Sequence, residues 1–177
     1  MKHIFWTVSF IFFLALCPIN MRAQNDGRLV HEALVNAPVD RVWAVLTTKE
    51  GMESWMTAHA AVELKVGGTM KSQYDPKGTV DDASAIENTI LSYDPMSMLS
   101  FKVTRTPDGF PFPNAIKNMW TVVYFIPEGS NMTRVREISM GFGKDDESKK
   151  MREFFDRGNA YTMQKLQERF PAKVGGN

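Results

Sequence analysis

Two hydrophobic patterns divide the chain: apolar and polar residues alternate over most of residues 29–142, and a helical repeat follows. The opening segment, residues 29–36, is rich in β-forming side chains and predicts a strand. Pro38 then stands at the start of a short amphipathic helix, because its fixed φ suits a first helical position. Thr48 is placed to cap a second short helix that reaches Trp55. The chain thus begins with one strand and two short helices.

Six further strands are expected after Ala58, separated by turn residues. Gly67-Gly68, Asp94-Pro95 and the segment 127–130 carry Gly, Pro and Asp, which favour tight turns. Between these turns the sequence predicts strands at residues 60–66, 69–74, 83–93, 98–106, 119–126 and 132–142. Residues 107–117 hold three prolines and a glycine, and predict a loop that carries aromatic residues.

A single long helix is expected from Asp145 to Phe170, stopped by the following proline. Spacings of three or four place one stripe on its inner face: Met151, Phe155, Asn159, Met163, Leu166 and Phe170. The amide of Asn159 interrupts this apolar stripe and needs a polar partner. One antiparallel sheet and one long helix must bury each other's apolar faces, which predicts an α+β fold. A curved sheet that grips the helix leaves a cavity unless large side chains fill it.

The first residues have the layout of a secretory signal peptide. Lys2 precedes an apolar run at residues 4–16, and the small residue Ala23 follows. The run is shorter than the roughly 20 residues that a spanning helix needs. We therefore expect a signal peptide at 1–23, a flexible start at 24–28, one domain at 29–170 and a disordered tail at 171–177. A retained anchor and a lipoprotein modified at Cys17 are the alternatives, and otherwise the protein is secreted or periplasmic.

Composition excludes several classes of function. The 177 residues carry 21 Lys and Arg against 20 Asp and Glu, so no basic field exists to attract nucleic acid. One cysteine excludes a disulfide framework and a thiolate zinc cluster, and three histidines are too few to indicate a metal site. We expect no metal, no cofactor and no membrane span in the mature chain. The oligomeric state stays open.

Several short motifs, in order, resemble the SRPBCC (START-like, polyketide cyclase-like) superfamily, and within it the branch named for the activator of heat-shock-protein ATPase. They are residues 35–47, Trp55, residues 66–68, Asp94-Pro95 with Leu99, Pro127, residues 133–135 and Gly141-Phe142. The resemblance implies a helix-grip fold: a curved antiparallel sheet of about seven strands, two short helices and a long C-terminal helix. It also implies a deep cavity for lipids, sterols, polyketides or similar hydrophobic molecules.

Two residues depart from the family pattern. The last helix usually has Gly-Trp where this chain has Gly158-Asn159, and an apolar position of the last strand is Glu137 here. Periodicity alone does not say which face of that strand is inside, but the family pattern places Val135, Glu137 and Ser139 there. Glu137 and Asn159 are therefore expected to contact each other or a polar group of a ligand. The candidate ligand-binding residues are Trp55, Leu99, Phe101, Val103, Thr121, Val123, Phe125, Val135, Glu137, Ser139, Phe155, Asn159 and Met163.

The leading interpretation is an exported protein that binds a small hydrophobic molecule without transforming it. The first alternative is a cyclase- or dehydratase-type enzyme that uses Glu137 or His59 as a general base. The second alternative is a chaperone ATPase co-factor, as the branch name indicates. No Ser nucleophile motif accompanies the histidines.

Overall fold

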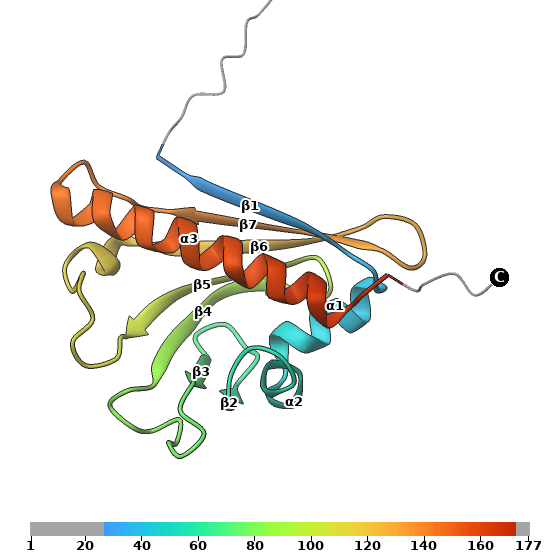
Figure 1. The fold of residues 1–177 in the computed structure, drawn as a ribbon, viewed down its shortest axis with the longest axis horizontal. Helices are drawn as coiled ribbons and strands as arrows, with labels where there is room; N and C mark the ends of the chain where they lie inside the picture. Colours follow the sequence, from blue (N-terminus) through green and yellow to red (C-terminus); the bar gives the residue numbers. More distant parts are fainter. Residues whose placement is uncertain (1–26, 173–177) are drawn as a thin grey trace, which may run out of the picture.

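The computed structural model describes residues 27–172 and contains one curved antiparallel sheet with a long helix across it (Figure 1). The seven strands lie in the order β1-β7-β6-β5-β4-β3-β2, so β1 and β2 are the two edges. The elements are β1 (Leu29–Val35), α1 (Val39–Thr47), α2 (Lys49–Glu53), β2 (His59–Val62), β3 (Thr69–Gln73), β4 (Ile86–Asp94), β5 (Met98–Arg105), the short 3-10 helix η1 (Ala115–Asn118), β6 (Trp120–Pro127), β7 (Thr133–Met140) and α3 (Asp146–Arg169). The expected α+β helix-grip fold is confirmed.

Strand ends differ from the expectation where glycine-containing turns interrupt the sheet. The strand expected at 60–66 ends at Val62, because residues 63–68 fold back as a turn. Gly67 has a φ of +77°, and a Cβ on Gly68 would collide with the carbonyl of Glu63. The strand expected at 83–93 begins only at Ile86, since the three residues before it belong to the preceding loop.

The two short helices form where the sequence places their caps. Pro38 precedes α1 as its N-cap, and Thr48 Oγ1 accepts a hydrogen bond of 3.0 Å from the Gly51 amide at the start of α2. The second helix ends at Glu53 and so is shorter than expected. Trp55 lies just beyond it, and its indole Nε1 donates to the Val45 carbonyl at 2.9 Å. This bond fixes the indole at the edge of the core.

Helix α3 begins at an acidic cap and crosses the concave face of the sheet (Figure 1). Asp145 accepts from the Ser148 amide at 2.9 Å. Side-chain bonds from Gln167 to the Leu34 carbonyl (3.1 Å) and from Asn36 to the Phe170 carbonyl (3.3 Å) tie the end of the helix to β1. The expected inward stripe is confirmed, because its members are buried or half-buried while most other α3 residues are exposed.

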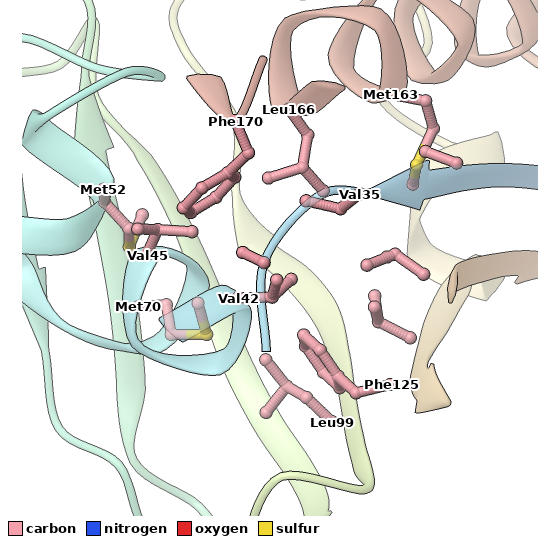
Figure 2. Close-up of a cluster of buried hydrophobic side chains, with 14 of the residues drawn as sticks. Val35, Val42, Val45, Met52, Met70, Leu99, Phe125, Met163, Leu166 and Phe170 are labelled. Atoms are coloured by element: carbon pink, nitrogen blue, oxygen red, sulfur yellow. The ribbon is translucent and has the colours of Figure 1, made fainter. Parts of the chain in front are cut away.

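The main core lies at the end of α3 where α1 and α2 meet the sheet. Figure 2 shows Phe170, Leu166, Val35 and Val42 converging there, and all four are almost fully buried. Trp43 packs edge-on against Phe125, with ring centroids 5.1 Å apart. A smaller cluster beneath the start of α3 joins Met151 to the residues around η1. The interior is therefore most solid near the C-terminal end of α3.

The expected signal peptide, residues 1–23, lies outside the described residues. Between residues 27 and 172, no helix combines the length and the apolar character that crossing a membrane requires.

Candidate ligand cavity

A cavity of about 330 Å³ lies between α3 and the concave face of the sheet. This volume is at the small end of the range for ligand sites in proteins. The walls come from α3, the loop after β5, β3–β7 and the region around α2. Of the thirteen candidate residues, all but Ser139 line it: Trp55, Leu99, Phe101, Val103, Thr121, Val123, Phe125, Val135, Glu137, Phe155, Asn159 and Met163. Ser139 is completely buried behind them.

Other lining residues were missed because only the tertiary fold brings them to the cavity. Tyr74 follows β3, Phe110 belongs to the loop after β5, and Phe154 lies off the inward stripe of α3. Methionine is abundant in the walls, and five members line the cavity: Met52, Met56, Met70, Met119 and Met163. Flexible thioethers and aromatic rings adapt to apolar molecules of varied shape. The twelve methionines among the 177 residues are a signal in the sequence that could have indicated such walls.

A second hollow, of about 460 Å³, adjoins the cavity and shares Trp55, Met56, Tyr74 and Thr162 with it. Tyr161 and Lys165 of α3 complete its lining together with Gly158. Tyr74 and Tyr161 are 55% and 60% exposed, so this hollow lies at the surface. It forms the mouth of the cavity, between the middle of α3 and the end of β3.

A small group of polar side chains interrupts the apolar wall where α3 passes over β7 and β6. Asn159 Nδ2 donates to Ser139 Oγ at 3.2 Å, and Thr121 Oγ1 lies 3.3 Å from the same oxygen. The Ser139 hydroxyl in turn reaches Glu137 Oε1 in a long hydrogen bond of 3.5 Å. Glu137 and Asn159 are therefore linked through Ser139, and no direct hydrogen bond joins the two side chains in the described part of the chain.

The carboxyl group of Glu137 is electrostatically unusual. Burial in the apolar cavity raises its pKa from 4.5 to about 7, and the hydrogen bond from Ser139 opposes this shift only in part. No Lys or Arg side chain lines the described cavity to balance a negative charge there. Near neutral pH, the protonated and the ionised forms of Glu137 are therefore both populated.

His31 lies on β1 directly opposite Glu137 in the strand register. Its Nε2 bonds to Asp156 of α3 at 2.9 Å, whereas Nδ1 is buried and lacks a hydrogen-bond partner. The ring does not line the cavity. Sequence reasoning missed this neighbour, since the two strands are more than a hundred residues apart along the chain.

His59, the other candidate base, lies away from the cavity. It begins β2, and its Nε2 contacts the Pro76 carbonyl at 3.1 Å. The structure therefore brings only Glu137 of the two candidate bases to the site. Within residues 27–172, no three His, Cys, Asp or Glu side chains are grouped so as to hold a metal ion.

Comparisons with known proteins agree with this architecture. The family model described as Activator of Hsp90 ATPase homolog 1-like protein matches residues 36–170. A search of curated proteins finds no match. Among solved structures, protein MLL2253 from Mesorhizobium loti is 17% identical with a TM-score of 0.62, covering 80% of this chain and 95% of that chain.

Two further solved structures have the same fold. The Aha1 dimer from Colwellia psychrerythraea is 15% identical with a TM-score of 0.63, covering 84% of this chain and 98% of that chain. CalU16 from Micromonospora echinospora is 17% identical with a TM-score of 0.58, covering 82% of this chain and 77% of that chain. At these identities the similarity shows the shared fold.

Proposed function

The chain belongs to the Activator of Hsp90 ATPase homolog 1-like family, and on this premise we propose that it binds a small hydrophobic ligand beneath α3 without transforming it. The observation that carries the proposal is the cavity of about 330 Å³, with mainly apolar walls and a polar corner at Glu137 and Asn159. Ligand sites in proteins combine an apolar lining with a few placed polar groups in this way.

Asn159 gives the sharpest test of this proposal, because it stands where the family usually has tryptophan. Its side chain lines the cavity, whereas the next residue, Ala160, is exposed. We expect Asn159→Trp to fill the cavity and weaken binding of an environment-sensitive apolar dye at least about tenfold. Ala160→Trp adds the same indole outside and should bind the dye like the unaltered protein.

Native mass spectrometry of the protein purified after expression of the full chain provides the second measurement. A molecule that copurifies with the unaltered protein and with Ala160→Trp, but not with Asn159→Trp, would support the cavity as its site. Equal dye binding by all three proteins would place the ligand elsewhere and contradict the proposal.

An enzyme that works by proton transfer is the second candidate, and the pKa of Glu137 favours it. A carboxyl group with a pKa of about 7 exchanges protons readily at neutral pH, as a general acid or base must. Turnover of an enolisable polyketide-like substrate, with a rate that depends on Glu137 and follows its titration, would favour catalysis over simple binding.

We also propose that the protein is exported and cleaved after Ala23. The support is the short apolar run with a basic start at the beginning of the sequence. Export would separate the protein from a cytosolic ATPase partner, so the family's name is a weaker guide to its role. Mass measurement of the protein from the cell envelope and from the medium tests this, and an intact residue 1–23 segment would contradict it.

A further inference from the structure

The carboxyl group of Glu137 offers a free acceptor to whatever fills the cavity. Oε1 accepts the long bond from Ser139, and among the described residues no donor reaches Oε2. The side chain nevertheless lines the cavity. Glu137 is half-buried, so its carboxyl group borders the cavity space, and an occupant that donates a hydrogen bond to this oxygen satisfies a polar atom in mainly apolar surroundings.

The surrounding side chains direct their protons toward this carboxyl group. Asn159 donates to Ser139, which uses one acceptor position of the hydroxyl. The single Ser139 proton then has two oxygens within reach, Thr121 Oγ1 and Glu137 Oε1. The carboxylate is the stronger acceptor. Asn159, Ser139 and Thr121 therefore form a donor chain that ends in Glu137, and the corner as a whole accepts hydrogen bonds from a ligand.

Charge narrows the choice of ligand further. The lining residues include no cation, and His31 opposite Glu137 is occupied by Asp156 and does not reach the cavity wall. The nearest positive charge at the mouth, Lys165, pairs with Glu168 at 2.6 Å. A second carboxylate brought in by a ligand would therefore meet Glu137 with nothing to offset the repulsion.

From these contacts we infer the ligand class: a neutral apolar molecule whose hydroxyl group donates to Glu137 Oε2. Acidic amphiphiles such as fatty acid anions are rejected. Trp55, Phe101, Phe110 and Phe155 in the walls favour a flat ring system as the apolar body. This inference rests on the proposed function, since it concerns the occupant of the same cavity.

Three probes of nearly equal shape test the inference: naphthol, methylnaphthalene and naphthoate. Naphthol carries a hydrogen-bond donor, methylnaphthalene carries no polar group and naphthoate carries a negative charge, all on the same ring system. At about pH 8 we expect naphthol to bind the unaltered protein at least about tenfold tighter than methylnaphthalene, because only naphthol can pair with the carboxylate. Naphthoate should bind most weakly. Titration followed by the fluorescence of the probe gives the three affinities.

Two variants assign the discrimination to Glu137. In Glu137→Leu the advantage of naphthol over methylnaphthalene should disappear. In Glu137→Gln, which keeps the shape and removes the charge, binding of naphthoate should strengthen at least about tenfold. Glu63→Gln, on the exposed segment after β2, is the matched control and should behave like the unaltered protein.

The outcomes separate this inference from the proposed function. Equal binding of naphthol and methylnaphthalene by the unaltered protein, or an advantage of naphthol that survives in Glu137→Leu, would overturn the ligand class and leave the cavity as a binding site. Failure of all three probes, together with dye binding that Asn159→Trp does not change, would overturn both.

Discussion

The middle and the C-terminal end of α3 rest on very different interiors, although both present phenylalanine to the sheet. Phe170, at the C-terminal end, is 5% exposed in the main core, and the guanidinium groups of Arg41 and Arg169 lie over its ring. Phe155, a little over four turns earlier, is half-buried and lines the cavity. The same residue type therefore closes a solid core at the end of the helix and borders a hollow near its middle.

This difference separates stability from binding along one helix. A closely packed interior loses free energy when atoms are removed, whereas a wall that already faces a void loses less. The main core at the C-terminal end and the Met151 cluster at the start fix α3 across the sheet, so its middle can span a cavity without collapsing into it. Binding residues can then change with a small effect on folding.

The largest effect is expected from truncating these two phenylalanines. Phe170→Ala should lower the free energy of unfolding by about 3–5 kcal/mol, because it leaves an enclosed cavity in the main core. Phe155→Ala should cost only about 1–2 kcal/mol, since it enlarges an existing one. Urea unfolding of both variants measures the difference. Equal losses would mean that the interior is packed as closely around Phe155 as around Phe170.

The second-largest effect is expected from the charge of Glu137 in the cavity. The pKa of Glu137 is about 7 in the folded protein, against an ordinary value of 4.5. The folded state therefore binds the proton more tightly than the unfolded chain does. The resulting stabilisation is complete below about pH 4.5 and is lost as the pH rises through 7. It amounts to at most about 3 kcal/mol. In Glu137→Gln this loss should be absent.

Urea unfolding at about pH 5 and about pH 8 compares the two proteins. Between these values, the unaltered protein should lose stability relative to Glu137→Gln. His31, which lies opposite Glu137 in the strand register, and its partner Asp156 on α3 are present in both proteins, so their contribution cancels. Parallel pH profiles would show that the carboxyl group is well solvated. Glu63→Gln, an exposed change, serves as the control and should follow the unaltered protein.

The sequence predicted the fold because its information is largely local. The alternation of strands, the caps at Thr48 and Asp145 and the spacing on α3 each depend on nearby residues, and each agrees with the structure. The errors lie at the ends of strands and at the end of α2. At residues 63–68 the apolar Leu64 and Val66 favoured a longer strand, but the backbone turns at Gly67 and Gly68.

The candidate site was predictable only in part. The family pattern placed Glu137 on the inner face of the sheet, and helical spacing placed Asn159 on the inner face of the helix. The bridge that Ser139 forms between them depends on side-chain geometry, which neither pattern describes. The neighbour His31 depends on the register of β1 against β7. Tyr74 and Phe110 come from loops whose paths no periodic pattern describes. Sequence reasoning missed these residues because contacts between distant parts of the chain bring them to the site.

The smallest effect is expected where the ring of Phe154 packs against the loop after β5, at the wall of the cavity. Phe154 on α3 is 44% exposed, yet its ring meets Phe110 at 6.1 Å and Phe112 at 5.7 Å in the loop after β5. Phe154→Ala should cost about 1 kcal/mol and speed amide hydrogen exchange at residues 107–113, because this loop loses its ring contacts with Phe154, while the Glu147 carboxylate of α3 still accepts from the Asn114 amide. Tyr161→Ala is the matched control, since its ring is 60% exposed and should change stability by less than about 0.5 kcal/mol.

Hydrogen exchange in these two variants decides how the cavity wall is held. Suppose that Phe154→Ala speeds amide exchange in the loop while amides of the main core stay protected. The loop is then a wall of the cavity that opens independently of the main core. Ligand entry past Phe110 would then need no movement of α3. If exchange in the loop is unchanged, contacts from η1 hold the wall in place, and the mouth near Tyr74 is the route by which a ligand reaches Glu137.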